Sequence, residues 1–285
     1  MSFDVAHPEV QETIKRALAE DIGSGDITTN LCVPADATAT GRVVARQELI
    51  LAGAELLQPI FDQIAQRVAG GRCEVLLQCS SGAHLVNGCE IAVVRGPARA
   101  LLTGERTALN FLQRLSGVAT LAHTYVAAIK GTRSKILDTR KTTPGLRQLE
   151  KMAVAAGGAT NHRAGLFDAV LIKNNHITAA GGVRAALERT RGFSVPVEIE
   201  VRSIEELGEA LAAGAKHLLL DNLTPNLARE WITTIAGRAT VELSGGITLE
   251  TVRAYAESGA DFISIGAITH SAPAVDINFR LEMEA

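Results

Sequence analysis

The sequence predicts an α/β protein in two parts, a small mixed α+β unit followed by an incomplete α/β barrel of six to seven strands. Its 285 residues exceed the length of one average domain. The pattern of apolar runs changes near residue 115, and beyond it short apolar runs alternate with amphipathic stretches. This alternation is typical of βαβ units that build a parallel sheet. A doubly wound open sheet is the structural alternative.

The first part mixes helices and strands without a regular repeat. Apolar residues at helical spacing predict a helix over 10–20, and a turn-rich acidic loop follows over 20–29. We expect strands at 40–47, 50–53, 73–79 and 90–99, and helices at 54–69, 101–115 and 120–129.

The second part repeats one unit. Runs rich in leucine or β-branched residues predict six strands, at 136–141, 169–173, 197–201, 217–222, 240–244 and 262–266. Helices are expected at 146–156, 183–191, 204–213, 227–236 and 249–258, and several end at a glycine, the usual stop signal. Strands that are apolar almost throughout suit a sheet covered on both faces. Six units fall short of an eightfold barrel.

Composition excludes several classes of protein. With 47% hydrophobic and 21% charged residues, the chain is not disordered. A net charge of −3 and 4% aromatic residues give no reason to expect a nucleic acid partner. The four cysteines form no C-x-x-C pair, the N-terminus lacks the features of a signal peptide, and no apolar run is long enough for a membrane span. We expect a cytoplasmic protein with no membrane partner.

Polar residues collect at the ends of the six predicted strands. These ends read Asp138-Thr139-Arg140-Lys141, Lys173-Asn174-Asn175-His176, Glu198-Ile199-Glu200, Asp221-Asn222, Ser244-Gly245-Gly246 and Ser264-Ile265-Gly266. In a barrel, the carboxyl ends of the strands surround one mouth, which carries the active site. One charged residue there would be ordinary loop chemistry, but six polar ends predict a site.

The last two ends predict a phosphate site. Their glycines let backbone N–H groups approach an oxyanion, and a helix that starts at Ile247 and Thr248 would favour negative charge at its N-terminus. Barrels often bind phosphate at their final two loops. The alternative is that the glycines only make tight turns.

Positive charge gathers at the first two ends. It comes from four permanent cations and a histidine beside one of them: Arg140, Lys141, Lys173, and Arg163 with His162. Such a cluster repels itself unless an anion fills it, and arginine suits carboxylates. The predicted substrate is therefore polyanionic, with carboxylates near the arginines and phosphates near the Ser-Gly ends. Glu200 and Asp221 would meet sugar hydroxyls or Mg²⁺, or else only neutralise the cations.

Several runs resemble the quinolinate phosphoribosyltransferase family, also called nicotinate-nucleotide pyrophosphorylase (carboxylating). They are Glu105-Arg106-Thr107-Ala108-Leu109-Asn110, Asp138-Thr139-Arg140-Lys141-Thr142-Thr143-Pro144-Gly145, Asn161-His162-Arg163, Leu171-Ile172-Lys173-Asn174-Asn175-His176, Glu198-Ile199-Glu200-Val201 and Leu243-Ser244-Gly245-Gly246-Ile247. The D-T-R-K-T-x-P-G run is specific, and the resemblance covers nearly the whole chain.

The resemblance implies an N-terminal α/β sandwich over 1–115, a barrel with fewer than eight strands over 116–271, and a tail, 272–285, that returns to the first domain. It implies transfer of phosphoribosyl from phosphoribosyl pyrophosphate to quinolinate with decarboxylation. The products would be nicotinate mononucleotide, pyrophosphate and CO₂, in de novo NAD biosynthesis. It also implies Mg²⁺ without an organic cofactor, and a homodimer with shared active sites or a higher oligomer.

The resemblance further implies the role of each site residue. The two quinolinate carboxylates would be held by Arg106, Arg140, His162, Arg163 and Lys173. Lys141 would meet phosphoribosyl pyrophosphate, and Glu200 and Asp221 would contact ribose hydroxyls and, directly or indirectly, Mg²⁺, which makes these three the expected catalytic residues. The 5′-phosphate would be bound by Ser244, Gly245, Gly246, Ser264 and Gly266, with His270 nearby. Thr139 and Ile265 complete the expected binding set.

Three other functions stay open. A Schiff-base aldolase could use Lys173 or Lys141 as the nucleophile, because neighbouring cations depress the pKa of a lysine. The chain could also be a divergent relative that acts outside NAD synthesis, such as the similar proteins associated with molybdenum transport. A sensor could use the barrel only to bind a phosphate ligand.

Overall fold

The computed structural model describes residues 4–68 and 71–283, and these residues form two compact units. The first unit holds the described residues up to His123, together with Thr142–Gly158 and the chain from Thr269 onward. The second unit holds Thr124–Lys141 and Ala159–Ile268. The chain therefore leaves the first unit and returns to it twice, whereas the sequence suggested a division near residue 115. Within the described ranges, no helix is both long enough and apolar enough to cross a membrane.

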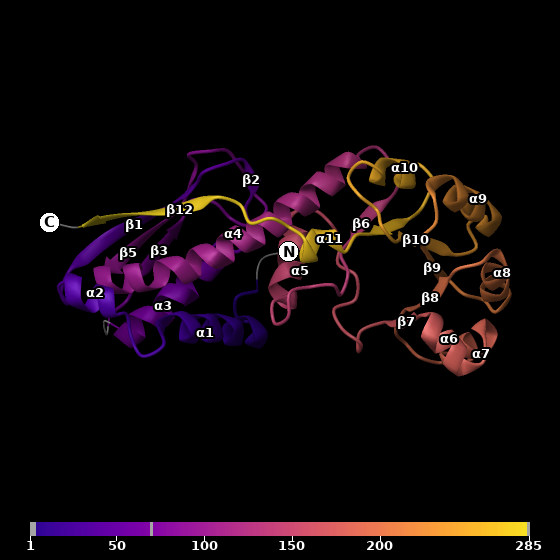
Figure 1. The fold of residues 1–285 in the computed structure, drawn as a ribbon, viewed down its shortest axis with the longest axis horizontal. Coiled ribbons are helices and arrows are strands. Elements are labelled where there is room, and N and C mark those ends of the chain that lie inside the picture. The colour runs from indigo at the N-terminus through magenta and orange to yellow at the C-terminus, as the bar shows by residue number, and fades with distance from the viewer. Residues whose placement is uncertain (1–3, 69–70, 284–285) are drawn as a thin grey trace. The chain divides into compact units, whose positions relative to one another are not determined.

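The first unit is an antiparallel sheet with helices on one face (Figure 1). The strand order is β12-β1-β5-β3, from β12 (Ile277–Met283), β1 (Thr38–Ala45), β5 (Glu90–Pro97) and β3 (Glu74–Leu77). Helices α1 (Pro8–Ile22), α3 (Leu57–Val68) and α4 (Ala98–Ala128) lie along the covered face. A short ribbon of β2 (Leu49–Ile50) and β4 (His84–Leu85), the turn η1 (Ala54–Leu56), α2 (Ile27–Cys32), α5 (Arg147–Ala156) and α11 (Ala267–His270) complete the unit or border it.

Aromatic packing attaches the last strand to this unit. The ring of Phe279 on β12 lies over Gly41 of the adjacent strand β1, where a Cβ atom would be 1.9 Å from the ring. The same ring stacks on Phe61 of α3, with ring centroids 6.2 Å apart. Glycine opposite a cross-strand aromatic ring leaves room for that ring to reach the core.

A buried ion pair joins the three chain segments of the first unit. Arg114 on α4 donates from Nη2 to Oε1 of Glu150 on α5 at 2.8 Å, and from Nη1 to the carbonyl oxygen of Ala272 at 2.7 Å. The other Glu150 oxygen accepts from the backbone N–H of Thr143 at 3.0 Å. Glu150 is fully buried, so loss of Arg114 would leave a buried charge without its cation.

Two expectations for the first part are wrong. The residues from 20 to 29 are not one loop, because α1 continues to Ile22 and α2 begins at Ile27. Asp26 caps α2 by accepting from the Thr29 N–H at 2.9 Å, which stabilises the helix start. The end of the helix expected over 54–69 falls partly outside the described residues.

Helix α4 is one helix of 31 residues, where the sequence suggested two. The expected break lay around Gly117. A Cβ atom at Gly117 would be 2.0 Å from the carbonyl oxygen of Pro273, so this glycine serves the close approach of another chain segment. A contact with a residue so far along the chain leaves no local signal, so the sequence gives no reason to continue the helix through this glycine.

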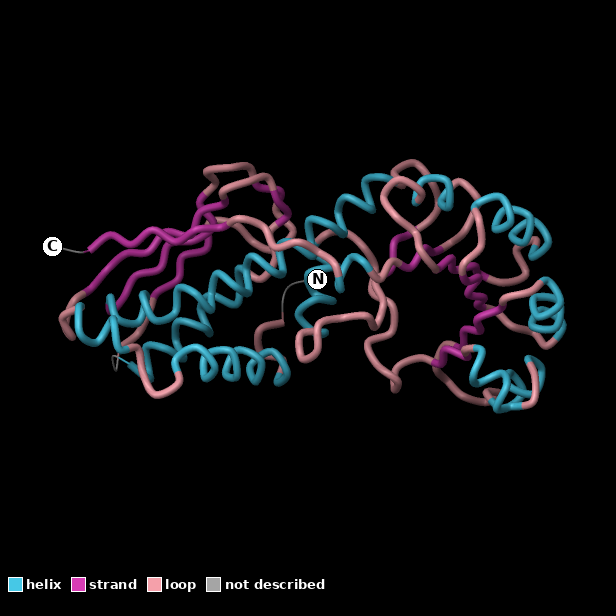
Figure 2. The backbone as a smooth tube through the Cα atoms, in the orientation of Figure 1, coloured by secondary structure: helices cyan, strands magenta, loops and turns pink. Residues whose placement is uncertain are grey.

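The second unit is an incomplete barrel. Its six parallel strands follow the order β6-β11-β10-β9-β8-β7, and Figure 2 shows them as an arc with helices on the outer side. The strands are β6 (Lys135–Leu137), β7 (Val170–Ile172), β8 (Val197–Val201), β9 (His217–Asp221), β10 (Thr240–Ser244) and β11 (Phe262–Ser264). The helices are α6 (Asn174–Ala180), α7 (Val183–Arg189), α8 (Ile204–Ala212), α9 (Pro225–Ile235) and α10 (Val252–Ala256).

This strand order decides between the two predicted architectures. From β7 to β11 each strand pairs with the next one along the chain, which excludes a doubly wound sheet. Strands β6 and β7 are the two edges, and an isolated bridge between Leu137 and Thr160 adds a seventh position beside β6. The predicted fold class, an α/β protein with an incomplete barrel, is confirmed. Helices α2, α6 and α11 were not predicted.

The close approach at Gly117 gives a stability prediction. Gly117→Ala places a methyl group against the Pro273 backbone, and we expect the free energy of unfolding to fall by about 2 kcal/mol or more. The matched control is Gly208→Ala on α8, where the added Cβ meets nothing within 4 Å, and which should stabilise by about 0.5–1 kcal/mol. Urea unfolding measures both. Equal midpoints for the two variants would contradict the assigned role of Gly117.

Candidate active site

A cavity of about 350 Å³ lies in the second unit, lined mainly by residues that follow the carboxyl ends of its strands. Most of the predicted site residues line it: Thr139, Arg140, Lys141, His162, Arg163, Lys173, Glu200, Asp221, Ser244, Gly245, Gly246 and Ser264. The parallel sheet brings these residues together, because all its strands end at the same edge.

The remaining predicted residues lie outside this lining. Arg106 is exposed on α4 of the first unit, and His270 belongs to the same unit, with Nδ1 2.6 Å from Oγ of Ser271. Ile265 is buried, and its N–H donates to the carbonyl oxygen of Leu137. Gly266 follows it, beyond the part of the loop that faces the cavity.

Four further residues line the cavity that were given no role from the sequence: Leu171, Leu219, Asn222, which belongs to a predicted polar strand end, and Glu242. Glu242 carried a usable signal, because a carboxylate inside an otherwise apolar, doubly covered strand must have a partner. Asn222 directly follows a predicted site residue and adopts a φ of 56°, a conformation that asparagine tolerates better than most residues.

The cations of the cavity crowd one another. Burial lowers the pKa of Arg163, and the positive charge of Arg140 lowers it further. The Arg163 side chain is held in place by a bond from Nη1 to the carbonyl oxygen of Ala169 at 3.1 Å. Lys141 and Lys173, both exposed, line the same cavity. An anion in the cavity would relieve this repulsion.

Two carboxylates of the lining occupy neighbouring strand ends. Glu200 at the end of β8 is buried, and its Oε1 accepts from Nη2 of Arg202 at 3.1 Å. Asp221 at the end of β9 accepts from Nδ2 of Asn222 at 2.6 Å. Both carboxylates line the cavity and so offer the oxygen ligands that Mg²⁺ prefers.

The glycine turn after β10 requires glycine at one position. Gly245 has a φ of +100°, and a Cβ atom there would lie 2.2 Å from Oδ1 of Asn222. The Asn222 N–H donates to the carbonyl oxygen of Ser244 at 2.9 Å, which keeps the two strand ends together. The helix expected to begin at Ile247 and Thr248 instead begins at Val252, so the donors that face the cavity are backbone groups of the turn.

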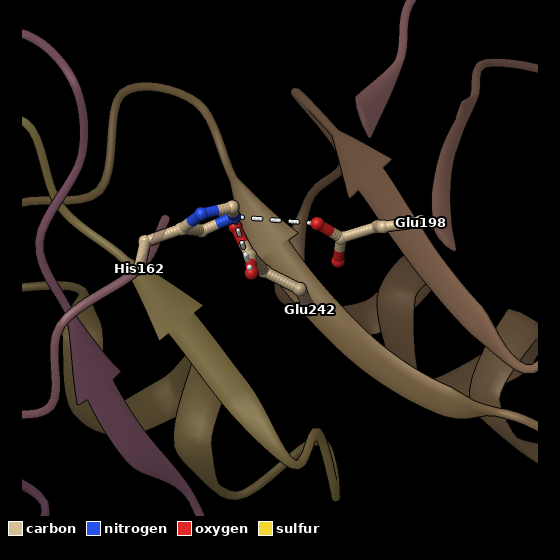
Figure 3. A group of neighbouring side chains, drawn as sticks. All are labelled: His162, Glu198 and Glu242. Carbon is tan, nitrogen blue, oxygen red and sulfur yellow. Dashed lines mark hydrogen bonds and ion pairs between the residues drawn. The ribbon is translucent and has the colours of Figure 1, made fainter. Parts of the chain in front are cut away.

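His162 forms a largely buried cluster with Glu198 and Glu242, which we call the His162 cluster (Figure 3). Nε2 lies 3.3 Å from Oε2 of Glu198 and 3.4 Å from Oε2 of Glu242, and the three side chains are 16%, 15% and 4% exposed. The backbone N–H of His162 donates to Oδ1 of buried Asp138 at 2.7 Å, and Nδ1 accepts from the Arg163 N–H at 2.7 Å. The ring is therefore held from both nitrogen atoms.

Burial alone would lower the pKa of His162, but the hydrogen bonds to Glu198 and Glu242 outweigh it and raise the pKa to about 9. For Glu198, burial itself raises the pKa. The ligand atoms of the three residues lie within 4.8 Å of one another, close enough for a metal ion. However, Nδ1 accepts a hydrogen bond, so the ring proton is on Nε2, and a histidine ligand normally donates from its second nitrogen. The arrangement suits a proton rather than a metal ion.

Family models match both parts of the chain. The quinolinate phosphoribosyl transferase N-terminal domain matches residues 26–116, and the C-terminal domain of the same family matches residues 118–280. The chain belongs to the quinolinate phosphoribosyltransferase family. The family and the enzyme class that the sequence predicts, a phosphoribosyltransferase of NAD biosynthesis, are thereby confirmed.

Relatives of this phosphoribosyltransferase match it along its whole length. A probable nicotinate-nucleotide pyrophosphorylase (carboxylating) from Bacillus subtilis (strain 168) is 40% identical over 280 residues, which are 97% of this chain and 95% of the relative. The nicotinate-nucleotide pyrophosphorylase (carboxylating) of Mycobacterium leprae is 41% identical over 292 residues, 99% of this chain and 100% of the relative. The solved nicotinate-nucleotide pyrophosphorylase from Francisella tularensis superposes with a TM-score of 0.89 at 37% identity, over 96% of each chain.

The His162 cluster gives the phosphoribosyltransferase a pH-dependent stability. The folded pKa of about 9 lies above the ordinary value of 6.5, so the stabilisation is complete below pH 6.5 and is lost as the pH rises through 9. Relative to His162→Gln, we expect the wild-type free energy of unfolding to fall by ~1–3 kcal/mol between pH 6.5 and 9.5. Urea unfolding at several pH values measures this difference, and parallel pH profiles for the two proteins would refute it.

Proposed function

We propose that the cavity of the second unit binds quinolinate and phosphoribosyl pyrophosphate side by side and joins them. The chain has the nicotinate-nucleotide pyrophosphorylase (carboxylating) activity of its family, a step of de novo NAD biosynthesis. The observation that carries the assignment of the site is one cavity that combines four cations, two strand-end carboxylates and a Ser-Gly turn. We assign the second unit as the phosphoribosyltransferase domain, and the free thiols of all four cysteines support a cytoplasmic location.

In this proposal, quinolinate binds at the cationic part of the cavity. Arg140, Arg163 and Lys173 pair with its two carboxylates, and His162 lines the same cavity. A guanidinium group binds both oxygens of a carboxylate, which orients the pyridine ring as well as attracting it.

Phosphoribosyl pyrophosphate occupies the rest of the cavity. Ser244, Gly245, Gly246 and Ser264 hold the 5′-phosphate, because the turn presents backbone N–H groups and hydroxyls. Lys141 meets the pyrophosphate, and Glu200 and Asp221 meet the ribose hydroxyls. The same two carboxylates suit Mg²⁺, which would neutralise charge on the leaving pyrophosphate. No organic cofactor is required.

The chemistry follows from this placement. The pyridine nitrogen attacks C1 of the ribose, the bond from C1 to the pyrophosphate oxygen breaks, and the cations stabilise the departing charge. The nitrogen is then positively charged and can accept electron density from the neighbouring carbon. The C2 carboxylate leaves as CO₂, its electron pair stays on C2, and C2 takes a proton.

The function is tested with two acids that differ by one carboxylate. Quinolinate should give pyrophosphate and CO₂, whereas nicotinate should react at least ~100-fold more slowly in kcat/KM, because it leaves cations of the cavity without a carboxylate partner. Coupled pyrophosphate assays and trapped CO₂ measure the two releases. Comparable use of nicotinate would overturn the proposed substrate, and absence of both releases from quinolinate would overturn the function.

The proposed assembly is a symmetric homodimer with shared active sites. Arg106 is exposed on the first unit and does not line the cavity of the second unit, although the family resemblance gives it a quinolinate carboxylate to hold. The position of Arg106 and its implied role agree if Arg106 of one subunit enters the cavity of its partner.

Mixed dimers test this assembly. Arg106→Ala and Lys141→Ala should each be inactive alone. After dissociation and reassociation, about half the dimers are mixed, and each mixed dimer has one complete site, so roughly a quarter of full activity should return. Subunit exchange is checked with differently tagged chains. A mixture that exchanges and stays inactive would show that Arg106 acts within its own chain.

A further inference from the structure

The proposed reaction consumes one proton at a defined atom. When CO₂ leaves, the electron pair of the broken bond remains on C2 of the pyridinium ring, and a C–H bond must form there. Water in the cavity could supply the proton, but a group of the protein held beside the ring would supply it without opening the site to solvent.

The His162 cluster lies at the same cavity as the cations. His162 and Glu242 both line the cavity, and Glu198 lies against Nε2 of His162 from the strand β8. Nε2 carries one proton, because Nδ1 accepts from the Arg163 N–H. That proton lies between two carboxylate oxygens that come from different strands of the sheet (Figure 3).

The negative charges of the two glutamates require a second proton in the His162 cluster. With a neutral ring, the two glutamates would put two negative charges into a buried site, which is strongly unfavourable for neighbouring carboxylates. A second proton removes one of these charges, either on Nδ1 at the expense of the Arg163 bond or on a glutamate. The raised pKa values of His162 and Glu198 have the same direction, and the proton belongs to the cluster as a whole.

We propose that His162, Glu198 and Glu242 together hold the proton that C2 of the pyridine ring takes when its carboxylate leaves as CO₂. The proposal rests on the proposed function. The bond from C2 to the carboxylate breaks, CO₂ departs, and the C2–H bond forms with a proton given by the cluster. The cluster then takes one proton from water, so that the next turnover starts from the same state.

The lysines of the cavity are less suited to this step. Lys141 and Lys173 are exposed, and in the proposed complex their ammonium groups face anionic groups of the substrates. Donation by either lysine would remove a cation from an anion that it stabilises. Donation by the cluster instead moves a proton away from a buried site into the bond that needs it.

The test separates the two halves of the reaction. Glu242→Gln keeps the size of the side chain and an oxygen that can accept from Nε2, but it cannot carry the proton. In single turnovers with quinolinate labelled at the C2 carboxylate, we expect pyrophosphate release within about threefold of wild type and CO₂ release slowed about 100-fold or more. The phosphoribosylated intermediate that still holds both carboxylates should accumulate. Glu198→Gln, on another strand, should give the same pattern.

The controls distinguish the possible failures. Glu209→Gln, an exposed glutamate of α8 outside the cavity, should leave both releases at wild-type rates. Urea unfolding shows which variants are folded, and either glutamine variant suffices if the other does not fold. Unchanged CO₂ release, or equal loss of both releases, in every folded variant would overturn the proposal. Failure of the wild-type protein to release pyrophosphate would instead overturn the proposed function.

Discussion

Charge compensation within one cavity governs the second unit. A parallel sheet collects the carboxyl ends of its strands at one edge, and this chain places two arginines and two lysines there. Such a concentration of positive charge opposes folding unless acidic groups share the cavity. Glu200, Asp221 and the His162 cluster supply them, and the arrangement that balances the empty cavity also prepares it for an anionic substrate.

The acidic groups are not equivalent. Glu200 and Asp221 stand at strand ends, each with a hydrogen-bond donor from a neighbouring residue. Glu242 is more deeply buried than Asp221, and together with Glu198 it takes its donor from His162. Glu200 and Asp221 therefore face the cavity from the strand ends, whereas Glu198 and Glu242 share the ring nitrogen Nε2 of His162. One sheet thereby offers two kinds of acid to one reaction.

The sequence was a good guide wherever a local pattern encodes the structure. Polar residues such as Arg140-Lys141 and Ser244-Gly245-Gly246 directly follow apolar runs in the sequence, so most of the cavity lining could be predicted. Glu242 is marked in the sequence only as a carboxylate within a predicted strand, and its partner His162 could not be predicted, because it comes from a loop far along the chain. The continuity of α4 through Gly117 could not be predicted for the same reason. The glycine is needed there because the backbone of Pro273 approaches it closely. Long-range pairing is the information that periodicity lacks.

The three-segment construction of the first unit affects how the chain can fold during synthesis. Helix α4 emerges from the ribosome long before Ala272, which accepts from Arg114, and before β12, which covers the edge of β1. Until the last strand appears, β1 exposes one edge of unpaired backbone, and the Arg114 site lacks an acceptor. The first unit is therefore completed only after the strands of the second unit have been synthesised.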